Sequence, residues 1–222
     1  MCYRSVLTTP KDALATLFAA LPDGLAEQQP RYNIRPTQPL VTIHTQDGQR
    51  VLREMRWGFV PHWYKTMRDG PLILNARAET IATKPAFAQA VRQHRCLIPS
   101  DGYYEWTTDD TGKGKDPWFI HPKSGQCLGF AGIWQLWRSN DGEDFETCAI
   151  VTTAANTKLH NLHARMPLII APNDFALWLG EAGHGAAKLM VPAPDDVLDY
   201  YRVERTINGA KDNDSGFIQP LG

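Results

Sequence analysis

A cysteine at position 2 would carry an amine and a thiol on one residue once the initiator Met1 is removed, as is normal before a small residue. The α-amino group titrates near ~8 and the thiol near ~8.5, so both nucleophiles are partly available at neutral pH. An aldehyde can form a Schiff base with the amine, and the neighbouring sulfur can then close a five-membered thiazolidine ring. Taken alone, Cys2 is more simply an incidental residue of a frayed terminus.

Five short segments are dense in charged, amide, histidine or aromatic side chains. They are RYNIRPTQ (31–38), WGFVPHW (57–63), LNARAET (74–80), SDGYYEW (100–106) and LHNLHARMP (159–167). Such clusters are rarely kept for packing, because a buried polar group without a partner costs on the order of 1–3 kcal/mol. Each segment is therefore a candidate part of a site.

The segment LNARAET places Asn75, Arg77 and Glu79 at alternate positions. On an extended strand these three side chains share one face, while Ala76 and Ala78 lie on the other. The polar face could form the floor of a site. It could equally face solvent, stabilised by an Arg77–Glu79 pair worth at most ~1 kcal/mol.

Glu105 lies between Tyr104 and Trp106, after an Asp-Gly turn. A carboxylate held among aromatic side chains tends to have a raised pKa, which would let it exchange protons near neutral pH. The alternative is that Glu105 points outward from an edge strand while its two neighbours pack inward. The local sequence does not choose between them.

His163 is a candidate proton shuttle, since histidine titrates near neutral pH, and His160 is its competitor. Nothing local separates the two, and either could be hydrogen-bonded scaffold. The histidines lack HExxH spacing and the cysteines lack a CxxC pair, so we expect no metal site and no cofactor.

The chain has 222 residues, 43% of them hydrophobic, enough to bury a full core, and we expect one domain over residues 1–222. The net charge of -1 does not draw the chain to nucleic acid, so any such binding must come from a local basic patch.

No apolar run approaches the ~18 residues of a membrane helix, and no signal pattern is present, so we expect a cytoplasmic protein. Cys96, Cys127 and Cys148 lie in or beside apolar runs and are expected in the core.

Helices are expected over three segments, 11–21, 85–94 and 173–179. The first should have Thr9 as N-cap and Pro10 in its first turn, with a buried stripe of Leu14, Leu17, Phe18 and Leu21. Strands are expected at 40–45 and 50–57, joined across Asp47-Gly48, then at 96–98, 103–106, 118–121, 128–137 and 145–153, the last two joined across Asp141-Gly142. A closing strand should cover 200–207. This order predicts an α+β fold, mainly antiparallel sheets in an open barrel-like or two-layer core with peripheral helices.

Together these segments resemble the SRAP family, the SOS-response-associated proteins that process abasic sites in DNA. The motifs stand in family order from residue 2 to the GFIQP tail: Cys2 with Arg4, RYNIRP, WGFVPHW, NARAET, CLIPSDGYYEW, IVTTAAN and LHARMP. Each motif alone is weak, but seven in order are specific.

The resemblance implies a covalent reaction with DNA damage. In similar proteins the N-terminal cysteine attacks the ring-opened aldehyde of an abasic sugar in single-stranded DNA and forms a thiazolidine crosslink. It implies Cys2 as nucleophile, Asn75 as an orienting group, Glu105 as the proton-handling carboxylate and His163 as the acid/base for sugar-ring opening. It further implies slow reversal and a lyase route by β-elimination when the thiol is absent. Older family labels suggest a peptidase, because a Cys, Glu and His set resembles an autoprocessing site.

The resemblance also implies a path for single-stranded DNA, which we expect a monomer to bind, near the nucleoid if the host is bacterial. Phosphate contacts would come from Arg4, Arg77 and Arg165, and the strand path would be lined by Asn33, Pro36, Trp63 and Thr152, with Lys84, Arg31 and Arg35 as additions. Otherwise each arginine could belong to an ordinary ion pair, and Trp63 to the core.

Two residues depart from the family pattern. Tyr3 stands where the family usually has glycine, and Ser5 where it usually has phenylalanine. Glycine allows close backbone approach, so Tyr3 would either narrow the pocket or supply a stacking surface. We expect activity to survive, because all four implied catalytic residues are present.

Two other functions compete. An N-terminal-nucleophile amidohydrolase would use an uncovered Cys2 with its own amine as base, which explains Cys2 but not the arginine and tryptophan pattern. A non-covalent single-stranded DNA-binding module would leave Cys2 idle.

Overall fold

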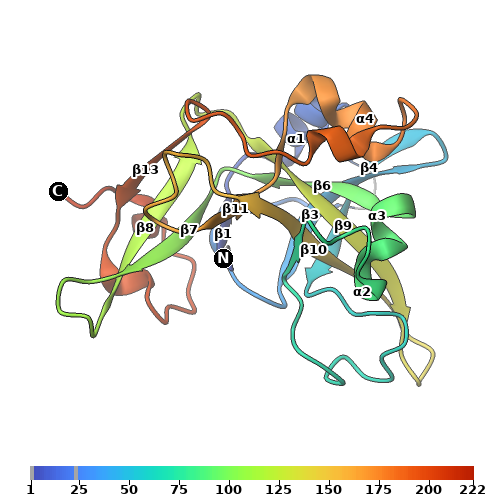
Figure 1. Cartoon of the computed structure of the whole chain (residues 1–222), viewed down its shortest axis with the longest axis horizontal. Helices are drawn as coiled ribbons and strands as arrows, with labels where there is room; N and C mark the ends of the chain where they lie inside the picture. The colour runs from blue at the N-terminus through green and yellow to red at the C-terminus, as the bar shows by residue number, and fades with distance from the viewer. Residues whose placement is uncertain (1–2, 23–24) are drawn as a thin grey trace.

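The computed structural model describes residues 3–22 and 25–222, so Cys2 lies outside the described residues. Its strands form two sheets, and the chain passes from one sheet to the other more than once (Figure 1). In the described part of the chain, the first sheet has the order β13 (Leu198–Arg202), β8 (Lys115–Pro122), β7 (Gly102–Thr108), β1 (Ser5–Leu7) and β2 (Arg31–Ile34). All its pairings are antiparallel.

The second sheet closes on itself. It runs β11 (Arg165–Pro167), β10 (Asp144–Ala154), β4 (Gln49–Trp57), β3 (Pro39–Gln46), β6 (Arg95–Ser100), β9 (Leu128–Arg138) and β12 (Ile169–Ile170), with β5 (Asn75–Arg77) added on β10. Because β9 also pairs with β10, the strands from β10 to β9 form a barrel. Among the strand-to-strand pairings of the described residues, only those of β10 with β4 and β5 are parallel. The expected α+β fold with a barrel-like antiparallel core is confirmed.

The hairpin of β3 and β4 forms where the sequence predicts it. Asp47 and Gly48 have φ values of 51° and 77°, and Gln46 pairs with Gln49 on either side of them. A two-residue hairpin turn needs positive φ at both positions, which Asp-Gly adopts readily. The second predicted hairpin, across Asp141-Gly142, joins β9 to β10.

The first helix, α1 (Lys11–Phe18), is shorter than predicted and begins differently. Its N-cap is Pro10, because the Thr9 hydroxyl donates instead to Asp101 at 2.6 Å. Leu14 and Phe18 are buried as expected. Leu21 is exposed, since the helix ends in a left-handed residue at Ala19 and the chain then forms a backbone bridge to β4.

The other predicted helices are also interrupted. The segment 85–94 forms two short helices, α2 (Pro85–Ala88) and α3 (Ala90–Gln93), and α4 (Phe175–Leu179) follows a 3-10 turn at Pro172–Asp174. The closing strand β13 ends at Arg202, and 3-10 turns follow at Arg205–Ile207 and Ser215–Ile218, with another before it at Ala186–Leu189. No helix within the described ranges is long and apolar enough to cross a membrane.

The hydrophobic core lies on both faces of the first sheet. Tyr103 of β7 belongs to the main cluster, which the barrel shares, and Tyr104 belongs to a smaller one with Val203 and Phe217 from the C-terminal segment. Adjacent strand residues face opposite sides, so β7 contributes to both clusters.

The three described cysteines pack in the main cluster as predicted. Cys96 and Cys148 are buried, and Cys127 is half-buried against the same cluster. Burial raises the pKa of each thiol, so all three are held as unreactive thiols.

Candidate functional site

A cavity of about 740 Å³ collects side chains from four separate segments of the chain. Tyr3, Pro36, Asn75, Arg77 and Lys84 all line it, and each was singled out from the sequence. The rest of its wall is mainly apolar: Pro71, Leu72, Ile73, Leu74, Ala86 and Phe87. These apolar residues were not predicted, because nothing in their local sequence distinguishes them from core.

Strand β10 sets the spacing of the polar residues. Asn75 and Arg77 pair with Ile150 and Thr152 on one edge of β10, and Arg165 pairs with Ala154 on its other edge. The two arginines therefore flank the C-terminal half of one central strand, although 88 positions (165 − 77) separate them in the chain.

Glu79 is not on the strand that the alternation predicts. Strand β5 ends at Arg77, and the amide of Thr80 donates to the Arg77 carbonyl, which closes a turn containing Glu79. The expected shared face of residues 75, 77 and 79 is therefore wrong at Glu79. Its carboxylate instead accepts from Arg165 Nη1 at 2.6 Å and from Nη2 at 2.9 Å.

Thr152 contacts the Arg165 guanidinium through its carbonyl and its hydroxyl. Thr152 is fully buried, its carbonyl accepts from Arg165 Nη2 at 2.7 Å, and its hydroxyl lies 3.3 Å from the same nitrogen. Together with Glu79 these contacts fix the guanidinium in one orientation. Thr152 thus acts on the site through Arg165.

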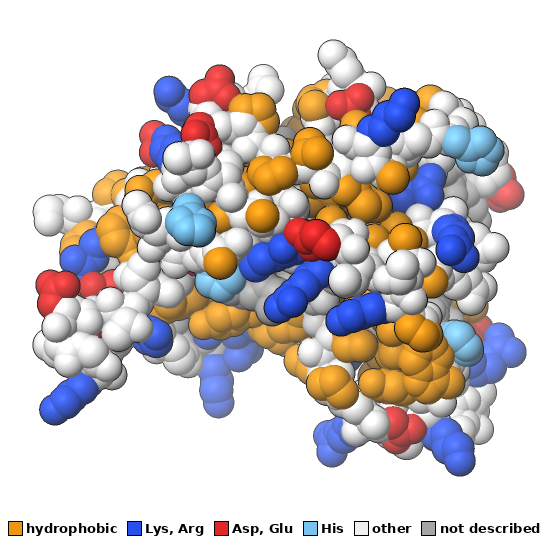
Figure 2. Space-filling view, in the orientation of Figure 1, with side chains coloured by type: hydrophobic (Ala, Val, Ile, Leu, Met, Phe, Trp, Pro, Cys, Tyr) orange, Lys and Arg blue, Asp and Glu red, His pale blue; other side chains and the backbone are white. Residues whose placement is uncertain are grey.

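Arg77 and Lys84 are the accessible cations of the cavity wall. Both side chains are exposed, and within residues 3–22 and 25–222 neither donates a side-chain hydrogen bond. Figure 2 shows several lysine and arginine side chains near one another at the centre of the face in view, with an acidic side chain beside them and hydrophobic side chains around them. The cavity therefore combines an apolar wall with positive charge at its rim, which suits an amphipathic anion.

Glu105 is buried, with 2% of its surface exposed, and it lies on β7 in the interior of the first sheet. The alternative of an outward side chain on an edge strand is therefore wrong. Burial raises the pKa of its carboxyl group, and the charge of His163 acts in the opposite direction. A carboxyl group in this setting can hold or release a proton closer to neutral pH than an exposed one.

The structure separates the two histidines. His163 interacts electrostatically with Glu105, and its Nδ1 lies 2.9 Å from the Arg165 amide nitrogen. The same Nδ1 also lies 3.1 Å from the Arg165 carbonyl oxygen, so the Arg165 backbone occupies this nitrogen and Nε2 is the ring nitrogen left for other partners. His160 is exposed in a turn and lines a different hollow with Asn156 and Asn161.

Arg4 is half-buried beside the first sheet. Its Nη1 donates to Asn33 Oδ1 at 2.6 Å, and its guanidinium lies 6.0 Å from the Trp106 ring. Asn33 is buried and donates in turn to the carbonyls of Ala210 and Asp212. Asn33 therefore ties Arg4 to the C-terminal segment, a role that the sequence pattern did not indicate.

Two further predicted residues lie on loops. Pro36 precedes Thr37, which has a left-handed backbone (φ 73°) and donates its amide to the Trp57 carbonyl at 2.8 Å. A β-branched residue adopts this conformation only where neighbours enforce it, so the loop that presents Pro36 is held firmly. Trp63 is 49% exposed, so its alternative assignment to the core is wrong.

Tyr3 lies against Trp106. The two rings stack with centroids 4.8 Å apart and planes inclined by 13°, and 40% of Tyr3 remains exposed. Ser5, the second departure from the family pattern, is buried and hydrogen-bonds Ser100 at 3.0 Å. Only Tyr3 of the two lines the cavity.

Comparisons with known proteins agree over nearly the whole chain. A family model described as SOS response associated peptidase (SRAP) matches residues 1–210. The abasic site processing protein YoqW of Bacillus subtilis is 34% identical, covering 99% of both chains, and YoaM of the same organism, also named an abasic site processing protein, is 35% identical over 98% of this chain and 97% of its own. A crystal structure of a protein from Bacteroides thetaiotaomicron superimposes with a TM-score of 0.86 at 25% identity, covering 99% of this chain and 100% of that one.

Proposed function

The chain belongs to the SOS response associated peptidase (SRAP) family, and on this basis we propose that it captures abasic sites in single-stranded DNA covalently through Cys2. The observation that carries the proposal is the cavity into which separate segments bring Tyr3, Asn75, Arg77 and Lys84. The names of its relatives as abasic site processing proteins support the choice of substrate.

The reaction needs only the aminothiol and the sugar. The α-amino nitrogen of Cys2 attacks the aldehyde carbon of the ring-opened abasic sugar, and loss of one water gives a Schiff base. The Cys2 thiol then adds to the same carbon while its proton passes to the nitrogen, which closes a thiazolidine. The sum is aldehyde plus aminothiol giving thiazolidine plus water, so no oxidant or cofactor is consumed. Where the Schiff base forms without the thiol, β-elimination is the lyase route.

The proton transfers are assigned to two residues. Glu105 is buried with a raised pKa, which supports a role in taking and returning the protons of the amine and the water. His163, whose Nδ1 is held by the Arg165 amide, would present Nε2 to the sugar and assist ring opening. Asn75, at the cavity wall, would orient the reacting sugar.

The strand would follow the cations of the same face. Arg77 and Lys84 line the cavity and are accessible to phosphates, while Arg4 and Arg165 are more enclosed and hold fixed orientations. Phosphate contacts of this kind position the strand without reading its sequence. Trp63, exposed on its loop, and Pro36, at the cavity, would contact bases or sugars along the path.

The deciding experiment uses single-stranded DNA with one abasic site, analysed on denaturing gels. The wild type should give a covalent band that Cys2→Ala lacks. Cys127→Ala is the matched control, because it removes a half-buried thiol and leaves the N-terminal one. Mass spectrometry of the intact protein should show that Met1 is absent, since a retained Met1 would block the aminothiol.

Other outcomes point to the alternatives. If no wild-type covalent band forms, covalent capture is wrong. Equal retention of abasic and intact strands, all of it lost on denaturation, would indicate a non-covalent binding module. Release of ammonia from glutamine by the purified protein, lost in Cys2→Ala, would indicate an amidohydrolase instead.

A further inference from the structure

Tyr3 and Trp106 form a rigid pair of rings at the cavity. Their stacking geometry, 4.8 Å between centroids at 13°, covers one face of Tyr3. With this face covered, 40% of Tyr3 is still exposed, and the residue lines the cavity. A flat aromatic surface therefore faces a space with an apolar wall.

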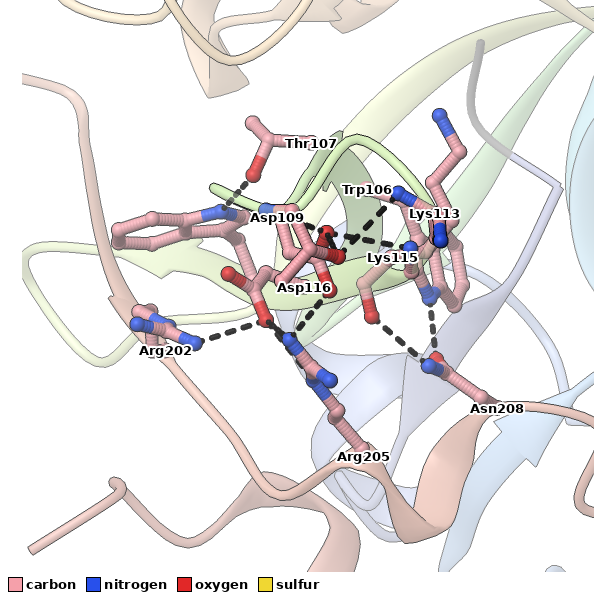
Figure 3. A network of polar contacts seen from close by, with 12 residues as sticks. Trp106, Thr107, Asp109, Lys113, Lys115, Asp116, Arg202, Arg205 and Asn208 are labelled. Atoms are coloured by element: carbon pink, nitrogen blue, oxygen red, sulfur yellow. Dashed lines mark hydrogen bonds and ion pairs between the residues drawn. The ribbon is translucent and has the colours of Figure 1, made fainter.

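A hydrogen bond to the C-terminal segment holds the Trp106 ring in place. Its Nε1 donates to Asn208 Oδ1 at 2.6 Å, and Asn208 Nδ2 donates to the Lys115 carbonyl at 2.9 Å (Figure 3). The guanidinium of Arg4 also lies 6.0 Å from the Trp106 ring, within cation–π range. The stacked rings of Tyr3 and Trp106 are thus held in place before any ligand binds, which reduces the entropy lost when another ring stacks on them.

The charged side chains near Tyr3 and Trp106 determine which kind of molecule would stack on Tyr3. Arg77 and Lys84 line the same cavity and carry exposed cationic side chains. A ligand that joins a flat ring to a nearby negative charge satisfies both features, and a nucleotide has this composition. A neutral aromatic compound would leave the two cations without partners.

We propose that Tyr3, supported by Trp106, is a stacking platform for the nucleobase adjacent to the abasic sugar, and that it sets the preference of this chain for the flanking base. This inference rests on the proposed function for its substrate. Among the two roles open to Tyr3, a stacking surface fits its parallel contact with Trp106. Purines present a larger face than pyrimidines, so a purine neighbour should bind more tightly.

The test separates stacking from covalent capture. The DNA carries a tetrahydrofuran residue, an abasic analogue without an aldehyde, flanked on its 5′ or 3′ side by the fluorescent base 2-aminopurine. Binding of the wild type should quench the fluorescence on one of the two sides. Tyr3→Phe should keep the quenching, and Tyr3→Leu should lose most of it and raise Kd about 5-fold to 150-fold, as loss of one base–aromatic stack does.

Two controls keep the outcome specific. Tyr200→Leu removes a half-buried aromatic residue from β13 and should leave quenching and Kd unchanged. A strand in which a spacer replaces the flanking base should bind wild type and Tyr3→Leu equally. Thermal melts of each variant should stay cooperative, so that a failure to fold is not mistaken for a loss of stacking.

The inference is overturned if Tyr3→Leu keeps the wild-type quenching on both sides, or if its loss of affinity persists with the spacer strand. Because the analogue cannot crosslink, this result is independent of the Cys2 chemistry. Absence of a crosslink with true abasic DNA, together with Tyr3-dependent quenching, would refute covalent capture and leave the platform standing.

Discussion

Glu79 binds Arg165 through both carboxylate oxygens, across 86 residues of sequence. The Arg165 side chain is only 17% exposed, whereas 51% of the Glu79 side chain is exposed. The hydrogen bonds from Arg165 hold the pKa of Glu79 below its usual range, so the pair is charged at neutral pH. An enclosed arginine expected to bind phosphate thus has its two terminal nitrogens already occupied by a carboxylate.

Replacing Glu79 should therefore strengthen non-covalent DNA binding. In Glu79→Gln the guanidinium of Arg165 loses an anionic partner that a phosphate must otherwise displace. We expect a lower Kd for single-stranded DNA. The slope of log Kobs against log[salt] should also become steeper by about 0.7, which is the effect of one additional phosphate contact. Fluorescence anisotropy over a series of salt concentrations measures both.

Glu143→Gln is the matched control, because Glu143 is exposed at the β9–β10 hairpin and the charge change is the same. Equal effects in both variants would reduce the result to net charge. Weaker binding in Glu79→Gln alone would mean that Glu79 orients Arg165 for phosphate and does not compete with it.

Arg77 and Lys84 should each contribute one phosphate contact. Both line the cavity with exposed side chains, so Arg77→Ala and Lys84→Ala should each weaken binding of single-stranded DNA and lower the salt slope by about 0.7. Arg138→Ala should change neither quantity, because Arg138 is the last residue of β9 and pairs with Asp144 at the start of β10, away from the β5 pairing. An unchanged slope in Arg77→Ala would place the strand elsewhere.

Local sequence determines some elements of this fold by itself. Asp47-Gly48 specifies a two-residue turn between two strand-like runs, so the β3–β4 hairpin was predictable. The segment 85–94 was predicted as one helix, whereas it forms two short ones at Pro85–Ala88 and Ala90–Gln93. No glycine or proline lies at the interruption, so the sequence gives no signal of it.

The contacts that assemble the site are long-range and were not predictable from local patterns. The parallel pairing of Arg77 with Thr152 joins strands that are far apart in sequence, and no local pattern encodes such a pairing. The same holds for Asn208, whose side chain fixes Trp106 from a turn without any recognisable motif. Motif order indicated which residues belong together and favoured His163 over His160, and the fold adds the reason, because His163 interacts with Glu105 whereas His160 lines a different hollow.

Low pH should weaken the ion pair that joins the β7–β8 hairpin to the C-terminal segment. Asp109 accepts hydrogen bonds from Thr111 and the Gly114 amide and pairs with Arg205, and its pKa is lowered to about 2 (Figure 3). The unfolded value is about 3.9, so this stabilisation is complete above that pH and is lost as the pH falls from about 4 to about 2.

Asp109→Asn should therefore lower the melting temperature at pH 7, and the difference from wild type should shrink to little at pH 2. Thermal melts across this range, followed by circular dichroism, measure it. Asp141→Asn, in the exposed β9–β10 turn, is the control and should melt like the wild type. A pH-independent difference would attribute the effect to packing instead of ionisation.

Glu105→Gln should separate the chemistry of the site from its stability. The amide cannot exchange a proton, so we expect crosslinking to abasic single-stranded DNA to slow about 100-fold or more, as loss of a general acid/base does. Non-covalent binding to the tetrahydrofuran analogue should be retained. Single-turnover gels and anisotropy measure the two quantities.

The same variant should be more stable than wild type at neutral pH. Burial raises the pKa of Glu105, so the folded protein holds the proton more tightly than the unfolded chain. Below the unfolded pKa of about 4.3 both states are protonated, and above it the unfolded chain ionises first, which costs the wild type stability until the pH passes the folded pKa. The stability gap should therefore open above about pH 4 in denaturant titrations. A variant that is slower but less stable at pH 7 would mean that ionised Glu105 is held by a stabilising partner, and the raised pKa would then be wrong.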